Sequence, residues 1–156
     1  MKFDMKNEDA NLEKFWEKPL SELDTREWEL LCDGCGRCCL KKFADDASEE
    51  IFYTRIVCRY FEQDSHRCGC YEERTKRVPE CLDVKKMDMQ FVNWMPDTCA
   101  YRLRFQDKDL FDWHPLLAGS REKMESENIA ITGKVISEEY VHPEGFEEHI
   151  IRWVKA

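Results

Sequence analysis

The sequence predicts a small α+β protein that folds as a single domain. The chain has 156 residues, carries apolar side chains at helical spacing near both ends, and has a stretch rich in β-branched and aromatic residues in between. A chain of this length is able to bury roughly 70% of the surface that its unfolded form exposes. We divide residues 1–156 into a helical N-terminal segment (1–31), a cysteine core (32–99), and a C-terminal strand and helix (100–156).

The N-terminal segment is predicted to contain two short helices. Residues 8–18 place their apolar side chains on one helical face, and Pro19 ends that pattern. Ser21 and Asp24 have the spacing of a capping box, which predicts a second helix from there through Leu31. This helix is expected to deliver the first cysteine of the chain at its C-terminal end.

Strands and a last helix are predicted farther along the chain. Residues 50–61 are rich in β-branched and aromatic side chains, which favours a strand. A polar break then separates Cys58 from Cys68, so these two residues are expected on the two arms of a small hairpin. Alternation over 129–135 predicts another strand, and apolar residues at helical spacing predict an amphipathic helix over 144–155.

The composition restricts the classes of partner. The chain has 24 Lys and Arg against 33 Asp and Glu, and the resulting net charge of −9 disfavours binding to nucleic acid or to an anionic membrane. No run approaches the 18 or so apolar residues of a membrane span, and the N-terminus has no apolar signal core. We therefore expect a cytoplasmic protein with no membrane or nucleic-acid partner.

Charged clusters in the sequence are expected to form solvated faces. The basic clusters at Lys41-Lys42 and at Arg74 with Arg77 sit among acidic residues. The adjacent acids Glu138 and Glu139 are likewise expected to be solvated rather than catalytic. The sequence also lacks a nucleophile elbow, a phosphate loop and a dinucleotide fingerprint.

The nine cysteines decide most about function. All of them lie between residues 32 and 99, at short spacings. Disulfide frameworks are typical of exported proteins, whereas a reducing cytoplasm keeps thiols free, and an odd count leaves one cysteine unpaired. Thiols that serve only as small hydrophobic groups would scatter along the chain. The clustering therefore favours metal binding through sulfur over both alternatives.

Four of the cysteines stand within eight residues, in the run Cys32-Asp33-Gly34-Cys35-Gly36-Arg37-Cys38-Cys39. Its two glycines accept positive φ, so the backbone is able to curl and turn several thiolates toward one point. Each CxxC step suits one metal, at about 2.3 Å for zinc. A bacterial ferredoxin run starts in the same way, but here Cys39 follows Cys38 directly and no proline comes next. Because neighbouring side chains point apart, these two cysteines are expected to serve different metals, or one as ligand and one as supporting thiol.

The remaining candidate ligands lie farther along the chain, at Cys58, Cys68, Cys70, Cys81, Cys99 and His114. Two closed tetrahedral zinc sites would use eight cysteines and leave one over, and a polynuclear zinc or iron cluster with bridging thiolates accounts for the count equally well. The expected cofactor is therefore zinc or iron, the latter including an iron–sulfur cluster. His114 is either a ligand or proton-transfer group, or a packed histidine that caps the following helix.

The cysteine run at 32–39 is followed by Cys58, by Cys68 with Tyr71 and Arg74 after it, by Cys81 behind a proline, and by Cys99. In this order these residues resemble the CxxCxxCC cysteine-cluster family, which is described as chelating zinc or iron. The flanking Thr98-Cys99-Ala100-Tyr101-Arg102 and Trp113-His114-Pro115-Leu116-Leu117 are similar to its YcgN-like branch. The family pattern implies eight metal ligands and leaves Cys70 as an extra cysteine.

The resemblance implies a metal-binding protein and leaves its precise role open, including whether it is an enzyme. A distant relative in the same superfamily methylates lysines of flagellin, which implies an iron–sulfur-dependent modification enzyme as one alternative. A metal chaperone or storage protein is the other alternative, and such a protein would leave some thiols exposed. The metal ion is the one partner that the sequence specifies, and a protein partner stays open.

Overall fold

The computed structural model describes residues 14–78, 81 and 89–156. It contains short helices and a few short strands, which confirms the predicted α+β class. The chain divides into two compact units, each built from two stretches of sequence. The first unit comprises Met1–Asp33 and Thr98–Glu127, and the second comprises Gly34–Asp97 and Asn128–Ala156. The single-domain boundaries 1–156 stay a prediction.

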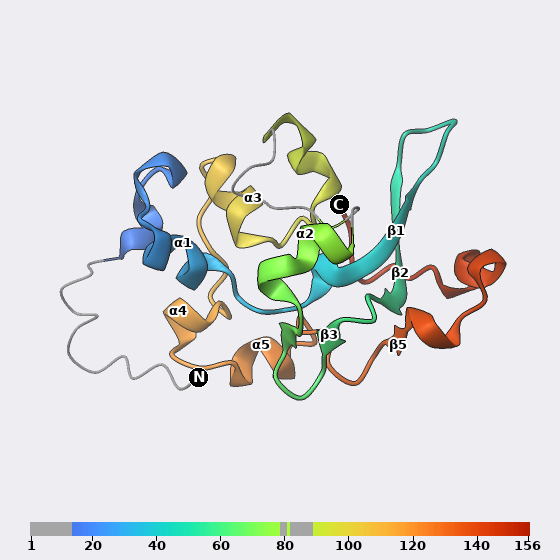
Figure 1. The fold of residues 1–156 in the computed structure, drawn as a ribbon. Helices are drawn as coiled ribbons and strands as arrows, with labels where there is room; N and C mark the ends of the chain where they lie inside the picture. The colour runs from blue at the N-terminus through green and yellow to red at the C-terminus, as the bar shows by residue number, and fades with distance from the viewer. Residues whose placement is uncertain (1–13, 79–80, 82–88) are drawn as a thin grey trace. The chain divides into compact units, whose positions relative to one another are not determined.

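The first unit carries short helical segments, which Figure 1 shows in blue and in yellow to orange. Its 3-10 helices are η2 (Phe15–Glu17) and η3 (Leu20–Glu22), and its α-helices are α1 (Thr25–Leu31), α3 (Ala100–Phe105), α4 (Pro115–Ala118) and α5 (Glu122–Ser126). None of the helices in the described part of the chain combines the length and the apolar character that a bilayer crossing requires. Of the helix predicted over 8–18, residues 8–13 lie outside the described residues, and η2 is the helical part that follows.

Helix α1 begins with a capping box that lies three residues later than predicted. The Asp24 carboxylate accepts a hydrogen bond from the Glu27 N–H (2.8 Å), and the Glu27 carboxylate accepts one from the Asp24 N–H (3.1 Å). The predicted box at Ser21 and Asp24 is wrong because Ser21 lies inside η3, and Leu23 and Asp24 are extended before the helix starts. The helix ends at Leu31, as predicted, so Cys32 is the residue that caps its C-terminus.

The second unit is built around a three-stranded mixed sheet with the order β1-β2-β5. Strand β1 (Leu40–Ala44) pairs antiparallel with β2 (Ile51–Val57), and β2 pairs in parallel with β5 (Ile136–Ser137). A two-stranded hairpin joins β3 (Phe61–Glu62) to β4 (Arg67–Cys68). Figure 1 shows β1 and β2 side by side. The helical segments of this unit are η4 (Arg37–Cys39), η5 (Tyr71–Glu73), α2 (Arg74–Arg77), η6 (Met89–Trp94), η7 (Glu138–Tyr140) and η8 (Pro143–His149).

The strand predicted over 50–61 is confirmed by β2, and the hairpin is confirmed by β3 and β4 with Cys68 on its second arm. The expectation that Cys58 lies on the first arm is wrong, because that arm begins only at Phe61, which pairs with Cys68. The strand predicted over 129–135 is wrong, because Gly133 has a φ of 78° and the chain turns there, with the Lys134 N–H donating to the Ile131 carbonyl. The strand begins only at Ile136.

The helix predicted over 144–155 is correct only as helical character up to His149, in the 3-10 helix η8. Beyond it the tail pairs with the backbone of strand β2. Ile150 forms an antiparallel bridge with Thr54, and the Ile151 N–H donates to the Tyr53 carbonyl. Pairing with an existing strand satisfies backbone groups that a short helix end would leave without partners.

The core of the second unit lies where the sheet meets the returning C-terminal stretch. Its fully buried side chains are Leu40, Tyr53, Val57, Ile131 and Val154. Cys39 and Phe61 pack against this cluster while remaining partly exposed. The cysteine-bearing segments therefore rest directly on the core, which limits how far their thiols are able to move.

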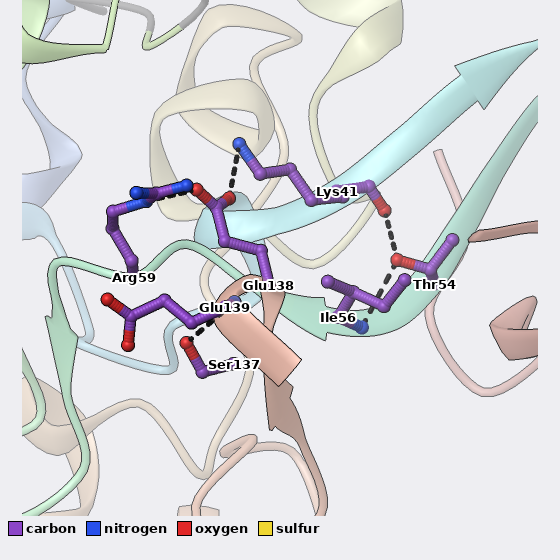
Figure 2. Close-up of polar contacts among 7 residues, drawn as sticks. All are labelled: Lys41, Thr54, Ile56, Arg59, Ser137, Glu138 and Glu139. Carbon is purple, nitrogen blue, oxygen red and sulfur yellow. Dashed lines mark hydrogen bonds and ion pairs between the residues drawn. The ribbon is translucent and has the colours of Figure 1, made fainter. Parts of the chain in front are cut away.

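Glu138 ties together two segments that each carry a cysteine (Figure 2). Its carboxylate lies 2.8 Å from the Lys41 Nζ and 2.7 Å from the Arg59 Nε. Lys41 lies two residues after Cys39, and Arg59 directly follows Cys58. The Glu138 side chain is only 13% exposed, so the expectation of a solvated acid is wrong for this residue.

The Glu138→Gln substitution is predicted to lower the free energy of unfolding by roughly 1 to 2 kcal/mol, since it removes a charge that two cations share in a partly buried place. Burial raises the pKa of Glu138, but hydrogen bonds from Lys41 and Arg59 outweigh this effect, and the pKa lies below its ordinary value. The stabilisation is therefore complete at neutral pH and is lost as the pH falls through the lowered pKa of the folded protein.

Urea unfolding of the two proteins at several pH values checks this prediction. The gap in stability between wild type and Glu138→Gln should be constant around neutral pH and should shrink in acid. Glu139→Gln is the matched control, because Glu139 is exposed and its substitution removes the same charge from the neighbouring position. An equal loss of stability in both variants would show that the ion pairs of Glu138 have no special role.

Candidate metal centre

The boundary between the two units falls inside the cysteine run, between Asp33 and Gly34. Cys32 therefore belongs to the first unit, where it is exposed at the end of α1. Gly34 and Gly36 have φ values of 71° and 81°, as the sequence predicts for a tightly curled segment. At Gly36 a side chain has no room, because a Cβ would stand 2.7 Å from the Ile131 Cγ1.

Cys35 is the buried member of the run. Its sulfur accepts a hydrogen bond from the Arg37 N–H at 3.5 Å, and its carbonyl accepts one from the Ile131 N–H at 3.0 Å. The Arg37 side chain is also buried, and its Nε donates to the Ile129 carbonyl at 2.8 Å. These bonds anchor the cysteine run to residues 129–131. They thereby fix the position of the backbone that leads into Cys38 and Cys39.

Cys38 and Cys39 lie in the tight turn η4, and their thiols are hydrogen-bonded to each other. This is contrary to the expectation that neighbouring side chains point apart, and the reason is the turn. The Cys39 N–H donates back to the Gly36 carbonyl at 2.9 Å, and the left-handed Gly36 lets the chain reverse there. Cys38 is exposed and Cys39 is largely covered by the core, so the pair leads from solvent to the interior.

Three further segments carry thiols that act electrostatically on this pair or on one another. The Cys58 N–H donates to the Cys39 carbonyl at 3.0 Å, directly after strand β2 ends. Cys68 ends β4, opposite Phe61, and its sulfur lies 3.6 Å from that of Cys70. Cys81 is half-buried, and its N–H donates to the Val78 carbonyl at 2.9 Å, beyond α2.

The thiols of these segments influence one another electrostatically. The six residues are Cys38, Cys39, Cys58, Cys68, Cys70 and Cys81. A hydrogen bond with Cys38 and burial raise the pKa of Cys39 far above its ordinary value, and the charges on Cys58 and Cys68 add to this. Burial raises the pKa of Cys81, and the charges on Cys38, Cys58 and Cys68 act in the same direction. Without a cation between them, such closely spaced thiolates repel one another.

Basic side chains surround the thiols. Burial lowers the pKa of Lys42, while charges on Cys38, Cys39 and Cys81 favour its ammonium form. Arg74 acts electrostatically on Cys81, and Arg77 on Cys70. The sequence prediction of solvated basic faces is therefore wrong for Lys42, which is partly buried. Lys41 is partly buried as well, and no local sequence signal reveals the burial of either lysine, because it follows from how strand β1 pairs with β2.

The donor set fits a metal ion that prefers sulfur, although the thiols do not yet enclose one. Four sulfurs at about 2.3 Å from a tetrahedral zinc ion are about 3.8 Å apart. The Cys68 and Cys70 sulfurs already lie near that spacing, at 3.6 Å. Within residues 14–78, 81 and 89–156, no three Cys, His, Asp or Glu side chains stand in an arrangement that could hold a metal ion.

The first unit holds the other predicted ligands, Cys32, Cys99 and His114. Cys99 is half-buried at the start of α3. His114 caps α4, since its Nδ1 accepts from the Leu116 N–H at 3.0 Å, and its Nε2 lies 2.8 Å from the Leu31 carbonyl. Both ring nitrogens are thus engaged within the protein, as in the packed-histidine alternative. Burial lowers the pKa of His114, which favours the neutral ring.

Comparison with known proteins agrees with this cysteine-centred site. Residues 31–100 match the family model CxxCxxCC, which is described as "Putative zinc- or iron-chelating domain". A UPF0260 protein of Marinobacter nauticus is 42% identical over 141 residues, which cover 90% of this chain and 95% of the relative. A UPF0260 protein of Ectopseudomonas mendocina is 43% identical over 143 residues, covering 91% and 96%. A third, from Allorhizobium ampelinum, is 40% identical over 142 residues, covering 90% and 89%.

No solved structure matches this chain. The similarity to known proteins therefore rests on sequence, and it extends over nearly the whole length of the relatives. The resemblance to the CxxCxxCC family is confirmed by the match over the cysteine core. The chain thus belongs to the UPF0260 family, and its residues 31–100 match the CxxCxxCC domain.

Proposed function

We propose that this protein binds zinc or iron through a thiol centre in the second unit, formed by Cys38, Cys39, Cys58, Cys68, Cys70 and Cys81. One observation carries the proposal: thiols from separate segments of the chain lie within electrostatic range of one another, two of them 3.6 Å apart. Clustered thiolates select soft or borderline cations such as zinc and iron. Cys32, Cys35, Cys99 and His114 stay predictions from the sequence and are not part of this centre.

The basic side chains around the centre support the same proposal. Four thiolates on one divalent cation leave a net negative charge, which is costly to hold in a partly buried place. Lys42, Arg74 and Arg77 lie where they offset that charge. An iron–sulfur cluster ligated by thiolates is also anionic, so the same surroundings suit either cofactor. We also propose a cytoplasmic location, because thiols stay reduced there.

Substituting single thiols tests the centre. Cys39→Ser, Cys58→Ser and Cys68→Ser are each expected to weaken metal binding by at least about tenfold, because each removes one of the proposed thiolate donors. Elemental analysis of anaerobically purified protein measures the bound metal, and competition with a chromophoric chelator measures its affinity.

Ser65→Ala is the matched control, because Ser65 is exposed and lies on the same hairpin as Cys68 without belonging to the thiol centre. Circular dichroism of each metal-free variant shows whether the fold is retained. Wild-type protein without zinc or iron, or thiol variants that keep full affinity while folded, would contradict the proposed centre.

The exposure of Cys38 favours the role of a metal chaperone, which transfers its ion to another ligand. An exposed thiol in the donor set is reachable by a competing ligand, which is the first step of ligand exchange. We expect zinc-loaded protein to lose its zinc to an excess of chelator while its far-ultraviolet circular dichroism persists. Zinc that leaves only when the chain unfolds would instead identify a closed structural site.

A further inference from the structure

The short segment Cys68-Gly69-Cys70 holds two thiols side by side at the edge of the centre. Their sulfurs are 3.6 Å apart and share a hydrogen bond, and both residues are partly exposed. A disulfide has its sulfurs about 2.05 Å apart, so modest side-chain rotations are enough to bring the pair to bonding distance. The two thiols are thus placed to react with each other.

Gly69 lies between the two cysteines and is hydrogen-bonded to the start of the hairpin. Its N–H donates to the Tyr60 carbonyl at 2.6 Å, which holds the segment against the start of the hairpin. A Cβ at this position would stand 2.7 Å from the Glu62 Oε1 and 3.3 Å from the Tyr60 carbonyl oxygen. A larger residue at position 69 would have to displace the Glu62 carboxylate, which is the end of an exposed side chain. The 3.6 Å between the two sulfurs is the observation that places the thiols together.

We propose that Cys68 and Cys70 are a redox modification site, a dithiol that a small disulfide of the glutathione class converts to an intramolecular disulfide. One cysteine, as the thiolate, attacks a sulfur of oxidised glutathione and forms a mixed disulfide, which releases one glutathione. The second cysteine, also as the thiolate, attacks the protein sulfur of that mixed disulfide and releases the other glutathione. The released thiolates take up the two protons that the cysteines lose. Two electrons pass from the cysteine pair to the glutathione disulfide.

The chemistry around the pair suits this reaction. Burial and the neighbouring Cys68 raise the pKa of Cys70, and the Arg77 guanidinium opposes this rise. Arg77 is also paired with Glu73 at 2.9 Å, and it is the cation nearest to hand for the anionic oxidised glutathione. A disulfide between residues two apart closes a small ring, and such strained bonds are readily reduced. The bond is therefore reversible under cellular thiol concentrations, unlike a structural disulfide.

Formation of the disulfide also removes two donors from the thiol centre. This consequence rests on the proposed function, because it requires that the centre hold a metal ion. Oxidation is then expected to release the metal, and bound metal is expected to slow oxidation by occupying the thiolates. The pair would in this way link the glutathione redox state to metal retention.

Trypsin provides a direct readout, since cleavage after Arg67 and Arg74 yields peptide 68–74, in which Cys68 and Cys70 are the two cysteines. The full-length protein, with zinc and without it, is incubated anaerobically with mixtures of oxidised and reduced glutathione. Free thiols are then alkylated and the peptides are weighed by mass spectrometry. The intramolecular disulfide appears as an unalkylated peptide that is two hydrogens lighter.

In zinc-free protein we expect at least about tenfold more disulfide in peptide 68–74 than intramolecular disulfide between Cys38 and Cys39, the neighbouring thiol pair that serves as an internal control. Cys70→Ser should instead trap glutathione on Cys68. Zinc loading should slow oxidation of the pair by at least about tenfold. Peptide 68–74 that stays alkylated in zinc-free protein, at glutathione ratios that oxidise other thiols of the chain, would overturn the proposal.

Zinc content measured in the same samples separates this inference from the proposed function. Disulfide formation in a chain that takes up no zinc or iron would uphold the redox pair and overturn the proposed metal centre. Full retention of zinc by a chain whose pair is oxidised would overturn the link between the two. The wild-type chain supplies both readouts, so neither depends on a variant that folds.

Discussion

The hydrogen bond from the Cys58 N–H to the Cys39 carbonyl is the interaction on which the thiol centre depends. It joins the end of β2 to the turn that precedes β1, and so brings together two cysteines that are nineteen residues apart in sequence. Sheet pairing sets the register of β1 and β2 beside this bond, and the ion pairs of Glu138 link Lys41 in β1 to Arg59, which follows Cys58. The remaining cysteines of the centre arrive on the hairpin and the helical segment that follow.

Two opposing electrostatic effects define the centre. Thiols that are close together and partly buried resist ionisation, as the raised pKa of Cys39 shows. The nearby cations Lys42, Arg74 and Arg77 favour the thiolate, and a bound metal ion would favour it far more strongly. The folded chain thus carries a cluster of donors whose repulsion a soft cation relieves. This is the physical reason why we propose metal binding for these residues rather than an inert packing role.

Local sequence signals predicted the parts of this structure that depend on local chemistry. The left-handed glycines of the cysteine run, the strand after residue 50 and the hairpin before Cys68 follow from residue types and spacing. The α+β class and the cysteine family followed from the same signals. The packed alternative for His114 also matches its place at the start of α4.

The sequence did not predict the features that depend on pairing between segments far apart in the chain. Ile150 and Ile151 join strand β2 instead of continuing a helix, because β2 offers backbone partners that the helical pattern does not reveal. The burial of Lys42 and Glu138 likewise depends on which strands meet. The meeting of the Cys38 and Cys39 thiols depends on a turn closed by Gly36, whereas the usual alternation of neighbouring side chains predicts the opposite.

X-ray absorption spectroscopy at the metal edge tests the central claim most directly. It is applied to protein purified without oxygen and carrying the zinc or iron it acquires in the cell. The thiol centre predicts a first shell made of sulfur, at about 2.3 Å for zinc. A first shell dominated by nitrogen or oxygen would contradict the account, since the described thiol centre offers sulfur donors.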